Sequence, residues 1–152
     1  MGKSTSYVWN NDPKRLGITL ARYKFVSKMV DKKDHLLEVG CGDSFQNRIV
    51  KQSCKMVTAI DINKELIFEA KENKSKKFLI NHINHNILAD PINKKKNLFD
   101  GVFSLDVLEH IQKNKEKLFI NNSIYNLKKN GYMIIGMPSL ESQKYASHKS
   151  KK

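Results

Sequence analysis

The chain has 152 residues, 39% of them hydrophobic, and its formal net charge at pH 7 is +13. A chain of this length and composition is expected to form one compact domain with its own hydrophobic core. No apolar run approaches the roughly 20 residues of a membrane-spanning helix, and the polar first residues lack the apolar centre of a secretory signal. We therefore expect a cytoplasmic protein with no membrane span.

The excess of positive charge suggests a nucleic-acid partner, because phosphate backbones attract clustered basic side chains. Only three of the 28 basic residues are arginines, namely Arg15, Arg22 and Arg48, whereas forked recognition of phosphates favours arginine. The lysines stand in short runs where loops and helix ends are predicted. A solvated lysine-rich surface explains the charge as well as a polyanion site does, so nucleic acid is an open alternative that is not favoured.

The first twelve residues are mostly polar and include Tyr7 and Trp9, two aromatic residues of the kind that is usually buried. Asp12 followed by Pro13 is typical of a helix N-cap and first turn. A helix is therefore predicted over residues 13–30, ahead of the first strand.

The apolar residues of this helix recur at helical spacing, which predicts one face packed on the core. They are Leu16, Leu20, Tyr23, Phe25, Val26, Met29 and Val30. Two polar positions, Arg22 and Tyr23, have two interpretations. They form a surface charge and an interfacial ring, or they belong to a lid that contacts the carboxylate of a ligand.

Short apolar runs then alternate with helical patterns. Strands are predicted over residues 35–39, 56–60, 78–83, 99–105 and 132–137, and helices over residues 44–53, 63–74 and 113–129. This alternation predicts an α/β fold, a Rossmann-like, mostly parallel sheet of about five strands with helices on both faces. We expect the domain to cover residues 1–138, and residues 139–152 to form a polar, flexible tail.

Acidic residues stand at the ends of three predicted strands, at Glu38, Asp61 and Asp106. Ligands of parallel sheets bind beyond the carboxyl ends of the strands. Gly40 and Gly42 form a turn that allows the backbone to approach a ligand closely, and Asp61 can accept both hydroxyls of a ribose. This spacing predicts a nucleoside-type ligand, whereas the third glycine of the dinucleotide pattern is absent.

The two cysteines are Cys41, inside this turn, and Cys54, beside a predicted strand. Because their spacing fits neither a metal site nor a disulfide framework, we expect both to be reduced thiols.

Four segments in this order resemble the class I S-adenosylmethionine-dependent methyltransferases. They are EVGCG at 38–42, TAIDI at 58–62, FDGVFSLDVLEHI at 99–111 and LKKNGYMII at 127–135. The resemblance covers about residues 36–138 and implies S-adenosylmethionine as the cofactor.

The resemblance also implies site residues. The glycine turn and Glu38 border the methionine half of the cofactor, Asp61 holds the ribose hydroxyls, and Ile62 packs on the adenine. Asn86 departs from the acid that the family commonly has beside the adenine amino group, but its side-chain oxygen can still accept a hydrogen bond. The implied cofactor contacts are Glu38, Gly40, Cys41, Gly42, Asp61, Ile62, Asn86, Ile87, Leu105 and Asp106.

Methyl transfer from a sulfonium is an in-line displacement, so holding acceptor and methyl at attack distance in a dry cleft can supply most of the catalysis. For a hydroxyl acceptor, His110 is the candidate general base, because its ordinary pKa of about 6.5 lies near working pH. Asp106 is the second candidate catalytic residue. The alternative for His110 is a histidine hydrogen-bonded to backbone at a helix start.

Asp106, Glu109 and His110 resemble the acid-x-x-acid-His cluster of some O-methyltransferases, in which a divalent ion can be held. Many relatives with the Glu-His pair bind no metal, so we assign no metal site. The sequence Ser-Leu-Asp-Val at 104–107 replaces the signature of amino-group methylation on nucleic-acid bases.

The resemblance thus favours methyl transfer to a small molecule or a saccharide or lipid precursor, at oxygen. The alternatives are an RNA methyltransferase that uses the basic surface, and a truncated or non-catalytic S-adenosylmethionine-binding protein. The family's full sheet has seven strands, whereas the apolar patterns here end at the fifth. Residues 132–137 would then be an apolar edge strand, which a partner chain or a dimer mate would cover.

Overall fold

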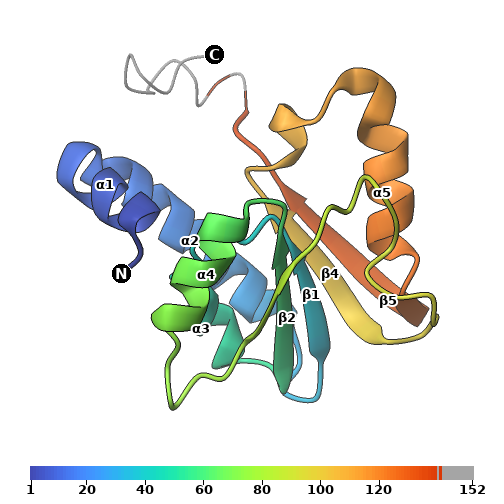
Figure 1. Ribbon diagram of the computed structural model, residues 1–152. Helices are drawn as coiled ribbons and strands as arrows, with labels where there is room; N and C mark the ends of the chain where they lie inside the picture. The colour runs from blue at the N-terminus through green and yellow to red at the C-terminus, as the bar shows by residue number, and fades with distance from the viewer. Residues whose placement is uncertain (140, 142–152) are drawn as a thin grey trace.

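A computed structural model describes residues 1–139 and 141, and its centre is a five-stranded parallel sheet with the strand order β3-β2-β1-β4-β5 (Figure 1). The strands are β1 (His35–Val39), β2 (Met56–Asp61), β3 (Asn81–Asn84), β4 (Phe99–Leu105) and β5 (Leu127–Gly136). The chain runs outward from β1 to β3 and then returns to the other side of β1. This reversal places a topological switch point between β1 and β4, where ligands of such sheets bind. The predicted fold class is confirmed.

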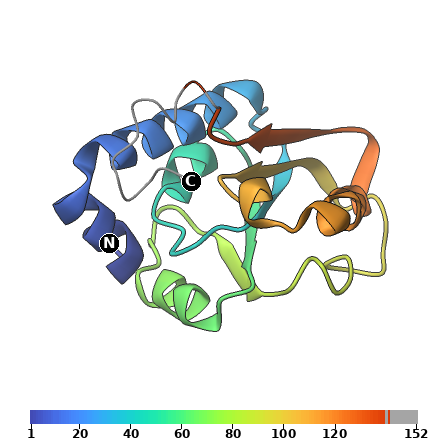
Figure 2. The same ribbon diagram turned by 90° about the horizontal axis from the view of Figure 1, so that it is seen from above.

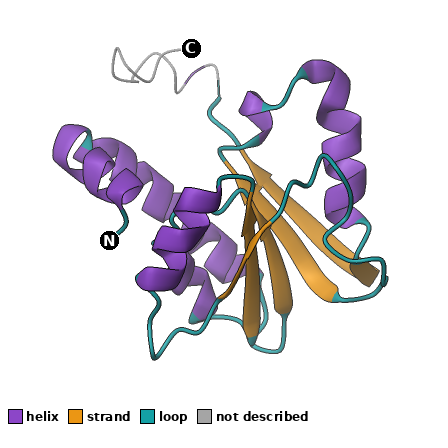
Figure 3. Cartoon of the chain, viewed as in Figure 1, coloured by secondary structure: helices purple, strands orange, loops and turns teal. Residues whose placement is uncertain are grey.

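Helices cover both faces of the sheet. The helices are α1 (Lys3–Asn11), α2 (Pro13–Met29), α3 (Asn47–Lys51), α4 (Lys64–Glu72) and α5 (Glu116–Ile124), with the 3-10 turns η1 (Leu108–His110) and η2 (Lys113–Lys115). Side chains of α2, α3 and α4 share one buried cluster with the sheet, and Phe119 of α5 belongs to a second cluster on the opposite face. Figure 2, seen from above, shows these two layers on either side of the strands. The loop of residues 85–98, teal in Figure 3, completes the second layer.

The start of α2 agrees with the sequence. Asp12 caps the helix through a bond from the backbone N–H of Arg15 to its carboxylate (3.2 Å), and Pro13 occupies the first turn, where its missing N–H costs nothing. The buried face contains Leu16, Tyr23 and Val26. Phe25 and Met29, which were expected in the core, are more than half exposed, because only one stripe of the helix contacts the sheet.

The first twelve residues also differ from the expectation. They form the helix α1, and Tyr7 and Trp9 lie on its exposed side with 58% and 55% of their surface accessible. Only Thr5 of this helix is buried. Its backbone N–H and hydroxyl both donate to the carboxylate of Asp43, at 2.8 and 2.7 Å. The helix is therefore fixed by polar contacts and not by its aromatic residues.

Several element boundaries were predicted wrongly, among them the start of the fifth strand, which is Leu127 and not residue 132. The last helix ends at Ile124 and not at residue 129, because the carbonyl of Asn126 accepts from the backbone N–H groups of Leu98 and Phe99 and so begins the pairing with β4. The first part of the predicted strand 78–83 is not in the sheet. The backbone N–H of Phe78 instead bonds to the hydroxyl of Ser75 (3.1 Å) in a turn.

The tail predicted for residues 139–152 lies outside the described residues, apart from positions 139 and 141. Within the part that the structure describes, no helix has both the length and the apolar character needed to cross a membrane.

Candidate functional site

The loop after β1 turns sharply at two glycines. Gly40 has a φ of +84° and Gly42 a φ of +56°, both in the left-handed region that favours glycine. A Cβ at position 40 would collide with the side chain of Val107, which follows β4, so this glycine is needed for close approach. A Cβ at position 42 would meet nothing within 4 Å. The backbone at Gly42 therefore faces open space that a ligand can occupy.

Asp61, at the end of β2, fixes this loop. One oxygen of its carboxylate accepts from the backbone N–H of Gly42 and the other from that of Asn63, both at 2.8 Å. Each oxygen retains a lone pair for a further donor. The next residue, Ile62, is 67% exposed. An acceptor for hydroxyl groups and an apolar surface thus lie side by side at the edge of the open space.

Glu38 is buried, with 1% of its surface accessible, and does not face solvent. The hydroxyl of Tyr23, from α2, donates to its Oε1 at 2.5 Å, and the amide of Asn47, from α3, donates to its Oε2. Burial raises the pKa of Glu38 to about 7, and the nearby charge of Asp61 adds to this rise, while the two donors oppose it. Glu38 therefore joins two helices to β1 below the glycine loop.

Asp106, directly after β4, has a φ of +58°, and its backbone N–H donates to the carbonyl of Gly136 (2.8 Å). Its carboxylate forms an ion pair with Arg22 of α2, and both side chains are partly buried. Consecutive residues of α2, Arg22 and Tyr23, thus bind acidic residues on the two sides of the switch point. The interpretation of Arg22 as a plain surface charge is therefore wrong, and its contact with a ligand stays a prediction.

Besides Glu38, three residues implied as cofactor contacts have buried side chains. Cys41 and Leu105 belong to the cluster under α2 and α3, and Ile87 belongs to the cluster on the opposite face. These residues can therefore meet a ligand chiefly through their backbones. Cys41 is a free thiol, as expected, and burial raises its pKa well above the ordinary value. Cys54 is also a free, buried thiol.

Asn86 is exposed, and its side-chain oxygen accepts from the backbone N–H of Leu88 (3.0 Å). The remaining lone pair of this oxygen can still accept from an amine.

His110 lies in η1, with an exposed side chain and with its backbone N–H bonded to the carbonyl of Val107 (2.9 Å). Glu109 is partly buried in the same turn. Among residues 1–139 and 141, no three metal-binding side chains come together, so Asp106, Glu109 and His110 do not converge.

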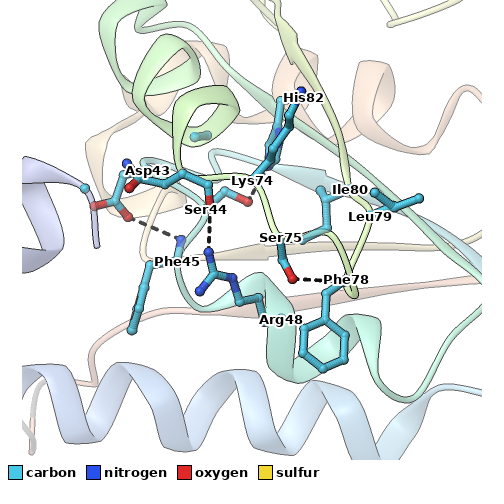
Figure 4. A pocket seen from close by; sticks show the side chains of 13 residues that line it. Asp43, Ser44, Phe45, Arg48, Lys74, Ser75, Phe78, Leu79, Ile80 and His82 are labelled. Carbon is cyan, nitrogen blue, oxygen red and sulfur yellow. Dashed lines mark hydrogen bonds between the residues drawn. The ribbon is translucent and has the colours of Figure 1, made fainter.

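Four polar residues around the loop were not indicated by the sequence, namely Asp43, Ser44, Asn47 and His82. Asp43 binds Thr5 of α1, and Ser44 contacts both Asn47 and His82. Figure 4 shows Asp43, Ser44 and His82 on the wall of a cavity of about 60 Å³ behind the loop, with the Asp43 carboxylate bonded to the backbone N–H of Phe45. The contacts of Asp43 with Thr5 and of Ser44 with His82 each join residues 38 positions apart, so no local pattern could have found them.

A family model described as a methyltransferase domain matches residues 37–135 of the chain. No curated protein matches the chain.

Solved structures share the fold. The N-methyltransferase NodS from Bradyrhizobium japonicum, in complex with S-adenosyl-L-homocysteine, has a TM-score of 0.64 at 21% identity over 84% of this chain and 63% of that chain. A TehB-like S-adenosylmethionine-dependent methyltransferase from Corynebacterium glutamicum has a TM-score of 0.65 at 17% identity, over 86% of this chain and 72% of that chain.

The [4+2]-cyclase SpnF has a TM-score of 0.64 at 17% identity over 76% of this chain. At these identities the likeness establishes the fold alone. The chain spans 43% of the length of the SpnF chain and 63% of that of NodS.

Proposed function

Because the chain belongs to the methyltransferase domain family and has the class I S-adenosylmethionine-dependent fold, we propose that it transfers a methyl group from S-adenosylmethionine to a small-molecule acceptor. The observation that best supports the proposal is the open space at Gly42, bordered by the carboxylate of Asp61 and the exposed side chain of Ile62. These three groups fit the parts of a nucleoside linked to an amino acid. The glycine backbone leaves room for the amino-acid part, the carboxylate accepts from the ribose hydroxyls, and the apolar side chain packs on the base.

In this proposal each of these groups holds one part of the cofactor. Asp61 accepts the ribose hydroxyls, Ile62 packs on the adenine, and Asn86 accepts from the adenine amino group. The backbone from Gly40 to Gly42 borders the methionine part, with Asp106 on the opposite side of the switch point. S-adenosylmethionine, when bound, supplies an electrophilic methyl group on a positively charged sulfur.

We assign to the carboxylate of Asp106 the role of favouring this positive charge, since an anion near a sulfonium lowers the free energy of the bound state. Its ion pair with Arg22 holds it at the end of β4. For an acceptor hydroxyl, the imidazole of His110 would take the proton that this hydroxyl loses on methylation. We place the acceptor among small molecules or saccharide or lipid precursors, with oxygen as the methylated atom.

The fold also supports a different reaction, since SpnF is a [4+2]-cyclase. Donor binding therefore has to be tested before transfer. Isothermal titration calorimetry should show binding of S-adenosylmethionine at sub-millimolar concentration and none of NAD, and Asp61→Ala should weaken binding at least tenfold because the charged acceptor of the ribose is lost. Equal affinity of Asp61→Ala and the wild type, or no binding at all, would contradict the proposal.

A further inference from the structure

Ser44 is a residue with a side chain in a conformation that favours glycine. Its φ is +56°, and among the described residues only three other residues with a Cβ have a positive φ, namely Asn97, Asp106 and Asn130. Asparagine and aspartate tolerate this region better than serine does. A strained residue at the edge of a binding loop is expected to be retained for what its side chain does.

The side chain of Ser44 connects three elements. Its hydroxyl oxygen lies 2.9 Å from the amide nitrogen of Asn47 in α3 and 2.8 Å from Nε2 of His82 in β3. All three residues are at least nine-tenths buried. The same amide of Asn47 donates to Glu38 of β1, so the bonds continue from β3 through the loop to β1.

The chemistry of the groups fixes the direction of one of these bonds. The amide nitrogen of Asn47 is a donor, so the Ser44 oxygen accepts from it. The Ser44 hydroxyl keeps its hydrogen and a second lone pair, so it pairs with Nε2 of His82 in either tautomer of the imidazole ring. Burial, with a smaller contribution from the charge of Lys71, lowers the pKa of His82 to about 4, which keeps the ring neutral at pH 7.

The other corners of the loop are fixed by different partners. Gly40 and Cys41 donate to the carbonyl of Ile60, and Gly42 donates to Asp61. These bonds secure the first part of the loop to β2. The last corner, at Ser44, is fixed to the β3 side of the sheet by the bond to His82.

We propose that Ser44 and His82 are positioning residues that hold the glycine loop in the shape required for donor binding. The inference rests on the proposed function. The hydroxyl-imidazole bond fixes the end of the loop relative to β3, so that the backbone at Gly42 keeps its place opposite Asp61. Neither residue touches the donor, and the effect passes through the loop.

The test compares S-adenosyl-L-homocysteine affinity, by isothermal titration calorimetry, with thermal stability. Ser44→Gly removes the backbone strain and the hydroxyl together. We expect its melting temperature to be at least that of Ser44→Ala, while its affinity falls about tenfold, because the loop is no longer held in the binding shape before the ligand arrives. A residue needed only for folding would lower the melting temperature when replaced and would leave the affinity of the folded protein unchanged.

His82 provides an independent pair of variants if Ser44→Ala does not fold. His82→Gln retains an acceptor for the serine hydroxyl and should keep most of the affinity, whereas His82→Leu should lose it. Asn97→Gly is the matched control, since Asn97 also has a positive φ (59°) but precedes β4, at the end of the sheet opposite the site. It should leave the affinity unchanged.

The outcomes separate the two proposals. If the wild type binds S-adenosyl-L-homocysteine and Ser44→Gly and His82→Leu bind it equally well, the positioning role is wrong and the proposed function stands. If the wild type does not bind it, both are wrong.

Discussion

Gly40 has the most restrictive environment of the loop residues, because its φ is +84° and a Cβ there would collide with Val107. We expect Gly40→Ala to destabilise the fold by about 2–4 kcal/mol, since it combines a strained backbone with overpacking. A methyl group at Gly17, in α2, would meet nothing within 4 Å, and Gly17→Ala should stabilise the helix by about 1 kcal/mol. Urea unfolding of both variants measures the difference, and a neutral Gly40→Ala would contradict the packing described for the loop.

Glu38 and His82 should give opposite pH dependences of stability. The pKa of Glu38 is raised from 4.5 to about 7 on folding, so its contribution is full below pH 4.5 and is lost as pH rises through 7. The pKa of His82 is lowered from 6.5 to about 4, so its contribution is full above pH 6.5 and is lost as pH falls through 4. In the wild type the two effects oppose each other between about pH 4.5 and 6.5.

Single variants separate these effects. Relative to the wild type, Glu38→Gln should become more stable as pH rises from about 4 to about 7, and His82→Gln should become less stable over the same range. The free energy of unfolding in urea, measured at several pH values, checks both slopes. Parallel profiles of the wild type and both variants would show that neither group has a shifted pKa.

Some site residues could be predicted from sequence and others could not. Gly40, Gly42, Asp61 and Asp106 were indicated because each stands at a fixed distance from an apolar run that ends there. Ser44 and His82, 38 residues apart, meet only because β3 pairs with β2 beside the loop. Polar contacts of this kind follow from the topology and leave no periodic pattern.

At the scale of elements, two adjacent side chains fix α2 across the switch point. Their contacts should contribute differently to the free energy of unfolding. Tyr23→Phe removes a buried donor to Glu38 and should cost about 1–3 kcal/mol of unfolding free energy. It should also raise the pKa of Glu38 further, because the tyrosine bond lowers it. Arg22→Gln breaks a partly exposed ion pair and should cost less than about 1 kcal/mol. A larger loss for Arg22→Gln would reverse this assignment.

The elements predicted best are those whose apolar run is continuous. The strands 35–39 and 99–105 were predicted with the bounds that β1 and β4 have, because both are central and buried. The end of α5 and the start of β3 were missed, because the carbonyl of Asn126 and the hydroxyl of Ser75 take up backbone N–H groups that the periodicity could not assign.

At the scale of the molecule, the arginines do not form a basic surface of the kind that binds nucleic acid. Arg22 is paired with Asp106, and Arg48 lies over the ring of Phe45 and donates to the carbonyl of Asn73 (2.6 Å). Two of the three arginines thus have internal partners, which favours the small-molecule proposal over RNA.

β5 forms one edge of the described sheet. β5 pairs with β4 on one side and with no other strand in residues 1–139 and 141, and Ile135 and Met137 are partly exposed there. Such edges pair with other chains. We expect Ile135→Lys to reduce concentration-dependent association, measured by light scattering, whereas Phe68→Lys on the exposed side of α4 should not. Equal association of both variants and the wild type would exclude this edge.

The central claim, that the loop after β1 and the end of β2 bind the donor, is tested most directly by two-dimensional NMR of the labelled protein titrated with S-adenosyl-L-homocysteine. The backbone amides of Gly42, Asp61 and Ile62 should shift in a saturable way, while that of Asn97 should not. Shifts confined to residues behind the loop, such as Ser75 and Ile80 in the cavity of Figure 4, or no shifts at all, would contradict the site.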